Sequence, residues 1–252
     1  MVLINCHTHT AYSGHGSGTI LEHAQAAFEA GIDTFCFTEH MPLPASIDPT
    51  CKFSIRPELV ESYFAEIEEA RKRFPSVHFV RGFEADWYEG ADEYLTRYMP
   101  QVELVLASLH MLNGWLFDSP KELESWERKN VNEVYEEYFS TWLEMATSSY
   151  NFNILSHPDL IKKFGHRPSF DERAFYKDIA KVVAQTDRRI EISTAGLRAP
   201  VKEMYPGPIF LEELCKAGVP CVISTDSHHI DQVAYQLSEA YAYARTIGYT
   251  SI

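Results

Sequence analysis

Apolar runs of strand length recur along this chain, and several of them end directly in front of a histidine or a carboxylate. Segments with helical spacing separate these runs, and such an alternation favours a parallel sheet with helical crossovers. In a barrel of parallel strands, the carboxyl ends of all strands meet at one face, so side chains far apart in sequence share one pocket. We therefore predict an α/β protein with its functional site at the carboxyl ends of the strands.

The predicted elements alternate along the whole chain. Segments 41–57, with four prolines, and 111–129, with two tryptophans, are predicted to be irregular. The absence of a repeat or linker in the sequence predicts a single domain over residues 1–252. The expected strands are 2–6, 33–38, 77–83, 104–109, 152–156, 189–193 and 221–225, and the expected helices are 21–30, 58–74, 131–148, 171–186 and 240–247.

Composition argues against several kinds of partner. The chain has 252 residues, 45% of them hydrophobic, which is enough for a buried core. Its formal charge of −14 argues against a nucleic-acid partner, because nucleic-acid sites are basic. No apolar run approaches the roughly 20 residues of a membrane helix, and the first residues lack the features of a signal peptide. Because five cysteines without a CxxC spacing fit a reducing compartment, we expect a cytoplasmic protein.

Residue types that can bind metal ions follow the predicted strands. His7 and His9 are two positions apart, so in extended backbone both side chains lie on one face and can bind one ion. Such a pair alone more often has a structural explanation, but the pattern continues at His40, Glu84, His110, His157, Asp226 and His228. Mixed imidazole and carboxylate donors suit Zn, Mn or Fe. The donors exceed what one ion uses, so at least two ions are expected, with a carboxylate such as Glu84 bridging them.

Six motifs occur in an order that is specific to one group of enzymes. They read INCHTHT, FTEHMPLP, GFEADW, SLH, SHPDL and STDSH, and the resemblance that they carry extends from His7 to about His228. In this order they resemble the polymerase and histidinol phosphatase (PHP) superfamily of metal-dependent phosphoesterases, and they look most like its histidinol-phosphatase branch. The resemblance implies a distorted TIM-like (β/α)7 barrel with a trinuclear metal site at the carboxyl ends of the strands.

The resemblance also implies how the ligands divide among three divalent ions. The first ion would be held by His7, His9, Glu84 and Asp226, the second by Glu84 with His110 and His157, and the third by His15, His40 and His228. The superfamily often has aspartate where this chain has His15, whereas histidine there is similar to members of the histidinol-phosphatase branch. The third site is therefore the one at which the affinity or identity of the metal is expected to differ.

Phosphate binding requires cationic side chains as well as metal ions. Arg198, in STAGLRAP, and Lys163, after SHPDL, match positions where related phosphatases carry phosphate-binding cations. The guanidinium of arginine grips two phosphate oxygens, and lysine adds a point charge. The alternative is that Lys162 and Lys163 form a solvated face.

The expected reaction is hydrolysis of a phosphate monoester through a metal-bridging hydroxide, with Glu84, Asp226 and His228 in catalytic roles. L-Histidinol phosphate is the first substrate to test, which implies a step of histidine biosynthesis. The nearest alternative is a PHP phosphoesterase acting on a nucleotide, a sugar phosphate or phosphotyrosine. A metal-dependent deaminase or amidohydrolase and a non-catalytic metal domain are more distant alternatives, and the full ligand set argues against both. The proton donor to the leaving oxygen stays open among Asp226, a metal-bound water and a histidine of the third site.

Other polar residues near the motifs have structural explanations. His23 lies in a helical pattern and is expected to be structural or exposed, and the side chain of His229 is expected to point away from that of His228. Glu39 precedes His40 and is expected either to orient an imidazole from behind or to act as a cap or ion-pair partner.

Overall fold

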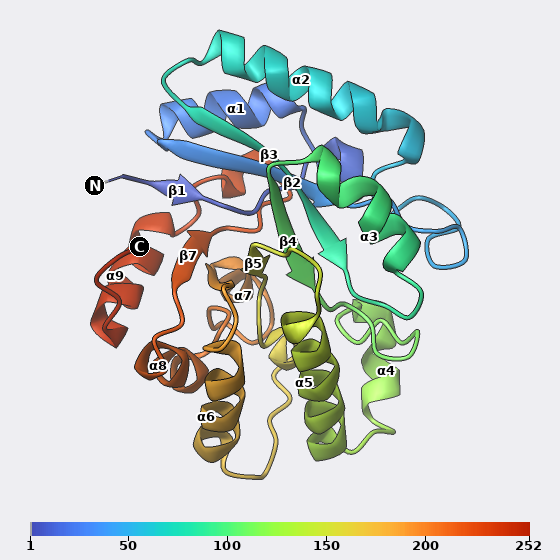
Figure 1. Ribbon diagram of the computed structural model, residues 1–252, viewed down its shortest axis with the longest axis vertical. Helices are drawn as coiled ribbons and strands as arrows, with labels where there is room; N and C mark the ends of the chain where they lie inside the picture. Colours follow the sequence, from blue (N-terminus) through green and yellow to red (C-terminus); the bar gives the residue numbers. More distant parts are fainter. Residues whose placement is uncertain (1) are drawn as a thin grey trace. The chain divides into compact units, whose positions relative to one another are not determined.

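The computed structural model describes residues 2–252, and the strands of this part of the chain form one seven-stranded sheet in chain order (Figure 1). The pairs β1–β2, β2–β3 and β5–β6 run parallel. Chain order with helical crossovers is the topology of a (β/α) barrel, and the predicted α/β class is confirmed. The strands are Ile4–Asn5 (β1), Thr34–His40 (β2), His78–Asp86 (β3), Leu104–Ser108 (β4), Ile154–Leu155 (β5), Arg189–Ser193 (β6) and Cys221–Ser224 (β7).

Helices alternate with these strands, and five of them match the predicted segments. Four others were missed by the sequence analysis, three of them because a helix of seven residues or fewer hardly shows a 3.6-residue period. The fourth, α8, begins with a proline at its first position. The helices are Ile20–Glu29 (α1), Val60–Arg73 (α2), Asp92–Tyr98 (α3), Leu123–Trp126 (α4), Val131–Thr147 (α5), Glu172–Val183 (α6), Ala195–Arg198 (α7), Pro208–Lys216 (α8) and Leu237–Ile247 (α9).

The chain divides into two compact units. The first unit comprises Met1–Ala85, Ala91–Leu106 and Ile223–Ser238, and the second comprises Asp86–Gly90, Ala107–Val222 and Glu239–Ile252. Each unit therefore combines segments that are distant in sequence. The single-domain organisation stays a prediction.

In the first unit, the register of β2 and β3 brings two predicted ligands together. Parallel pairing places His40 opposite Glu84 at the ends of these strands. Helices α1 and α2 pack against each other beside the strands (Figure 1). Phe35, Phe37 and Phe79 are buried from the two strands, and burial of each such ring stabilises the fold by roughly 1.5–3 kcal/mol. The aromatic core thus fixes the strands whose ends carry the site.

In the second unit, an aromatic cluster joins three helices. Tyr176 of α6 stacks on Phe210 of α8 at 4.5 Å between ring centroids, and Phe139 of α5 meets Phe210 edge to face at 5.5 Å. Strands β5 and β6 of the same unit pair in parallel, with Leu155 opposite Ile190. This core supports the segments that follow β5 and β6.

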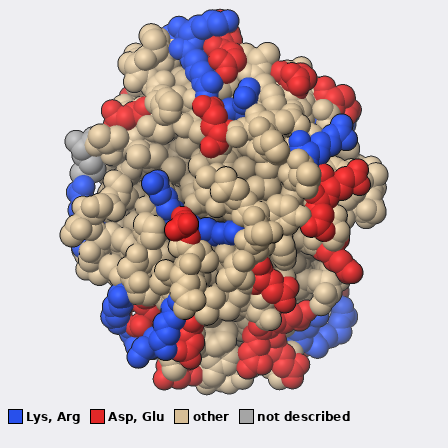
Figure 2. All heavy atoms as spheres, in the orientation of Figure 1, with Lys and Arg blue, Asp and Glu red and all other residues tan. Residues whose placement is uncertain are grey.

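Charged side chains of both signs are interspersed on the face that Figure 2 shows. A nucleic-acid footprint is a band of one sign, and the absence of such a partner stays a prediction. None of the helices within residues 2–252 is long and apolar enough to cross a membrane.

Candidate metal centre

The segment that follows β1 presents His7 and His9 on the same side. Thr8 between them forms a parallel bridge with Ser227, and the His9 N–H donates to the Ser227 carbonyl at 2.8 Å. The side chain of Asn5 fixes the start of this segment, because it accepts from the Thr225 N–H at 3.0 Å and donates to the Thr225 hydroxyl at 2.8 Å. The Nε2 atoms of His7 and His9 lie 2.9 Å apart, as predicted for alternate residues of extended backbone.

Four residues predicted to hold one ion lie together in the first unit. Glu84 Oε2 is 3.2 Å from Nε2 of His7 and 3.2 Å from Nε2 of His9. Asp226 Oδ1 lies 3.7 Å from His7 Nε2 and 3.4 Å from His9 Nε2. Only Asp226 of the four has a partly exposed side chain, at 17%. This donor set of imidazole and carboxylate fits Zn, Mn or Fe.

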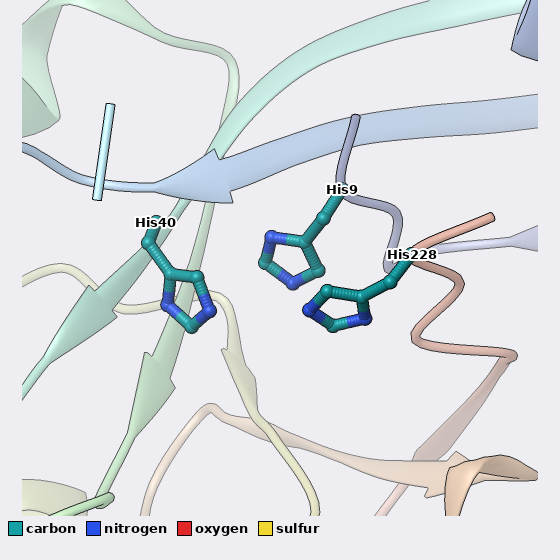
Figure 3. A group of neighbouring side chains, drawn as sticks. All are labelled: His9, His40 and His228. Carbon is teal, nitrogen blue, oxygen red and sulfur yellow. The ribbon is translucent and has the colours of Figure 1, made fainter. Parts of the chain in front are cut away.

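A second group of histidines adjoins this set. His9, His40 and His228 can each offer a nitrogen within 4.8 Å of the others, and Figure 3 shows their three rings converging from separate segments of the chain. His15 Nε2 lies 3.0 Å from His228 Nε2. The prediction grouped His15, His40 and His228; the geometry adds His9 as their neighbour.

The orientation of His15 depends on a turn that the sequence analysis missed. Its Nδ1 donates to the carbonyls of Ser13 and Lys52, each at 3.0 Å, which directs Nε2 toward His228. The Asp48 carboxylate holds the turn by accepting from the backbone of Lys52 at 2.9 Å and of the next two residues. Asp48 is buried. The sequence DPTCKFS indicates a polar turn, but it does not indicate that this turn contacts His15.

Opposing charges strongly shift the titration of this site. Burial alone lowers the pKa of His9, but hydrogen bonds with Asp226 and Glu84 outweigh burial and raise this pKa to about 9. Burial and then the charges of His40 and His9 lower the pKa of His15 to about 4. The pKa of Asp226 lies well below its usual value, because the charge of His7 and the hydrogen bond with His9 outweigh the opposing effect of burial. The histidines and carboxylates of this site thus hold fewer protons than they could bind separately. A bound metal cation takes the place of such protons.

The second unit holds the other two predicted ligands. The rings of His110 and His157 lie 5.0 Å apart between centroids. Asp86 Oδ1 is 2.6 Å from the ring nitrogen Nδ1 of His110. Glu191 Oε2 accepts from the backbone N–H of His157 at 2.5 Å. A carboxylate on the far nitrogen of a histidine is typical of metal sites, and GFEADW gave a signal for Asp86, two residues after Glu84. The role of Glu84 as a ligand to the second ion stays a prediction.

The two adjacent lysines have different environments. The Lys162 side chain is completely buried, with Nζ 2.8 Å from Asp159 and 2.7 Å from Glu203, so the alternative of a solvated face does not hold for this residue. Lys163 is 28% exposed and pairs with Asp118 at 2.9 Å. Arg198 ends the short helix α7, in a segment for which no helix was predicted. The phosphate-binding roles of Lys163 and Arg198 stay predictions.

Two further histidines near the motifs lie as expected. The side chain of His229 points away from that of His228, as predicted, and its Nδ1 lies 2.7 Å from the Ser17 hydroxyl. His23 is buried in α1 and its Nε2 donates to the Ser17 carbonyl at 2.9 Å, which agrees with a structural role.

Comparisons with known proteins agree with this geometry. The family model described as PHP domain matches residues 5–195. A probable histidinol-phosphatase of Deinococcus radiodurans is 33% identical over 249 residues, covering 98% of this chain and 94% of the relative. A histidinol-phosphatase of Bacillus subtilis is 29% identical, with 91% and 94% of the two chains covered.

Two solved structures share the fold. A putative histidinol phosphatase of Listeria monocytogenes has a TM-score of 0.83 at 22% identity and covers 94% of this chain and 99% of its own. The histidinol phosphate phosphatase of Lactococcus lactis, solved in complex with zinc, L-histidinol and phosphate, has a TM-score of 0.80 at 20% identity, with 98% and 94% of the two chains covered. The predicted distorted TIM-like (β/α)7 barrel is confirmed.

Proposed function

Because this chain belongs to the PHP domain family, we propose that it is a metal-dependent phosphomonoesterase that hydrolyses L-histidinol phosphate to L-histidinol and phosphate. The observation that carries the proposal is the convergence of His7, His9, Glu84 and Asp226, where carboxylate and imidazole donors lie within 3.2–3.7 Å of one another. Support for the substrate comes from the relatives named histidinol-phosphatases, which match over nearly their whole length.

The proposal includes three divalent ions, of Mn, Zn or Fe. The first would be held by His7, His9, Glu84 and Asp226, the second by Glu84, His110 and His157, and the third by His15, His40 and His228. Bound ions would neutralise phosphate charge and lower the pKa of water at the site. Every nitrogen and oxygen named belongs to a donor type that these metals accept.

The side chains of this protein would position the metal ligands and bind the phosphate. Glu84 and Asp226 supply negative charge that keeps the ligand histidines in place, and Arg198 and Lys163 would bind the phosphate oxygens. In hydrolysis, a water oxygen attacks phosphorus in line, the ester P–O bond breaks, and the leaving alcohol takes a proton. The side chains of Asp226 and His228 are partly exposed, 17% and 24%, which suits groups that face a substrate.

The cellular setting follows from the proposed reaction. Its product, L-histidinol, belongs to histidine biosynthesis, and we propose that the enzyme works in the cytoplasm. Its partner would be a small phosphate monoester, without a nucleic acid or a membrane. Five free cysteines agree with a reducing compartment.

Phosphate release tests the proposal. The purified protein, loaded in turn with Mn, Zn or Fe, is assayed against L-histidinol phosphate, a nucleoside monophosphate, a sugar phosphate and phosphotyrosine. We expect the highest kcat/KM for L-histidinol phosphate, by about tenfold or more, since a site that hydrogen-bonds its substrate rejects analogues lacking those groups. Preference for another monoester would retain the phosphatase and replace the substrate. Release from none of them with any metal would refute the phosphatase itself.

A further inference from the structure

A buried serine and a buried glutamate lie behind His9, on the side away from the metal ligands. Ser13 Oγ is 3.3 Å from His9 Nδ1 and also hydrogen-bonds to Glu39 Oε2. The direct separation of Glu39 Oε2 from His9 Nδ1 is 4.0 Å, so the hydroxyl is the connection between them. We propose that Ser13 and Glu39 form a relay that holds the proton of His9 on Nδ1 and leaves Nε2 as the metal-binding atom.

The direction of the relay follows from the donors around Glu39. Its Oε1 accepts from the Thr10 N–H at 2.7 Å and from the Thr10 hydroxyl at 2.6 Å, and its Oε2 accepts from Ser13. A carboxylate accepts all of these bonds and donates none. Ser13 has a single hydroxyl proton, which is used on Glu39, so only a lone pair of its oxygen faces His9. Nδ1 of His9 must therefore carry the proton.

The other nitrogen of His9 is the one that reaches the ligands. His9 Nε2 is 2.9 Å from His7 Nε2, 3.2 Å from Glu84 Oε2 and 3.4 Å from Asp226 Oδ1. A histidine that binds metal usually donates its second N–H to a carboxylate or carbonyl, which fixes tautomer and ring orientation. Here a serine hydroxyl lies between histidine and carboxylate. Since His9 adjoins two groups of candidate ligands, its tautomer affects both.

Local structure places the relay behind the site. Glu39 and His40 are consecutive in β2, so their side chains leave opposite sides of the strand. Thr10 caps the 3₁₀ turn Ala11–Ser13, and Gly14 ends this turn with a φ of 75°, a conformation that favours glycine. The turn brings Ser13 over His9. Thr10, Ser13 and Glu39 are all buried, which excludes water from this path.

The substitution Glu39→Gln reverses the relay in a predictable way. The amide oxygen of glutamine can still accept from Thr10, but its NH₂ group then faces Ser13. Ser13 must accept from that amide, and its own proton turns toward His9. His9 is driven to carry its proton on Nε2, the metal-binding atom. We expect zinc affinity to fall about 10–100-fold, the range for residues that support a metal ligand.

A double-mutant cycle separates the relay from a merely structural role. Ser13→Ala removes the acceptor of the Nδ1 proton and is expected to weaken zinc binding by about tenfold. The double variant S13A/E39Q lacks the hydroxyl that imposes the wrong tautomer, so it should bind zinc more tightly than Glu39→Gln alone. Glu66→Gln is the matched control, because Glu66 accepts from the Tyr12 hydroxyl at 2.8 Å and takes no part in the relay; its affinity should stay within about twofold of the unmodified protein.

Zinc affinity is measured by chelator competition on the full chain, with folding checked by circular dichroism. The ¹H–¹⁵N spectrum of the zinc-loaded protein should show His9 protonated at Nδ1. A double variant that binds no better than Glu39→Gln would overturn the relay, as would His9 protonated at Nε2. If Glu39→Gln fails to fold, Ser13→Ala decides: unchanged affinity overturns the relay.

The inference rests on the proposed metal-dependent function, and the two fail separately. An unmodified protein that binds zinc and releases phosphate while the double variant shows no recovery overturns only the relay. An unmodified protein that binds zinc, shows the recovery and releases no phosphate supports the relay and refutes the phosphatase. An unmodified protein that binds no zinc overturns both.

Discussion

His40 and Glu84 are direct partners across β2 and β3, and His40 Nδ1 lies 3.1 Å from Glu84 Oε2. The same Glu84 oxygen is 3.2 Å from Nε2 of His7 and of His9. One buried carboxylate oxygen thus touches three imidazoles that come from two different segments. The negative charge of Glu84 is therefore shared among three candidate ligands of the first unit.

Glu84→Gln should remove most of the bound metal and lower kcat by about 100-fold or more, beyond the roughly 10–100-fold typical of residues that only support a ligand. The glutamine keeps the shape of the side chain and loses its charge. Metal content after gel filtration and phosphate release measure the effect. The same substitution at Glu68, on the exposed side of α2, serves as the control; similar losses in both variants would contradict this role of Glu84.

Asp226→Asn should abolish at least about 99% of the activity with little change in folding, whereas Asp226→Ala should also lower the melting temperature. Asp226 has a φ of 46°, a left-handed conformation that asparagine adopts more readily than alanine. The added strain in the alanine variant amounts to about 1–2 kcal/mol. Calorimetry and phosphate release separate the two effects. Normal turnover in the asparagine variant would remove Asp226 from the site.

The metal-free protein should lose stability as pH rises from about 6.5 to about 9. His9 has a pKa of about 9 in the folded protein, against 6.5 for an ordinary histidine. The protonated form is favoured by folding, so its contribution is complete below pH 6.5 and disappears as pH passes through 9. Urea unfolding in EDTA measures the change, and His9→Asn should flatten the curve over this interval. Equal slopes in both proteins would show that His9 is not responsible.

Zinc affinity should change with pH in the opposite sense. Binding displaces the His9 proton, so affinity should rise between pH 6.5 and 9, and calorimetry in buffers of different ionisation enthalpy should detect its release near pH 7.5. A binding reaction that releases no proton at this pH would contradict the raised pKa of His9.

Asp48→Ala should weaken the ion bound through His15 and leave the ion at His7 and His9 in place. The Asp48 carboxylate organises the turn that supplies the Lys52 carbonyl to His15. Loss of its buried hydrogen bonds should also lower stability by about 1–3 kcal/mol. Metal titration followed by elemental analysis should show one weakened equivalent. Uniform loss of all metal would mean that the turn supports the whole site.

Two neighbouring lysines should respond differently to the same substitution. Lys162→Met removes the cation between Asp159 and Glu203 and leaves a buried charge without compensation, which should destabilise the protein by about 3–5 kcal/mol. Lys163→Met should leave the melting temperature nearly unchanged and raise KM by roughly tenfold, the loss expected for one charge-assisted hydrogen bond. Thermal melts and steady-state kinetics measure both. An unchanged KM would exclude Lys163 from phosphate binding.

The placement of the candidate ligands could be predicted from sequence because their positions follow from the period of the strands. His40 and Glu84 each come at the end of an apolar run, and strand register then places them together without further information. The α/β fold class was predictable for the same reason. Strand boundaries were less so: β5 comprises only Ile154–Leu155, because the chain leaves the ladder before His157.

Glu39 was expected either to orient an imidazole or to act as a cap or ion-pair partner, but the partners of the residues behind the candidate ligands could not be predicted, because they lie at distances along the chain that no local pattern encodes. Ser13 and Glu39 are 26 positions apart, and Asn5 bonds to Thr225 across 220 positions. Each has a common side chain with many structural uses. The three-dimensional structure is needed to show which of these uses applies. Lys162 is a further example, because it is buried although lysine is usually exposed.

The bridge between Thr8 and Ser227 has a consequence for the order of events during synthesis. The two residues are 219 positions apart, so His7 and His9 leave the ribosome long before Asp226 and His228 exist. Nearly all of the second unit is made in the interval. Until the last strand emerges, the nascent chain can offer an ion only part of the first set of ligands. A chain interrupted before Asp226 lacks two of the proposed ligands however well its earlier segments have folded, so we expect the proposed centre to load metal late in synthesis.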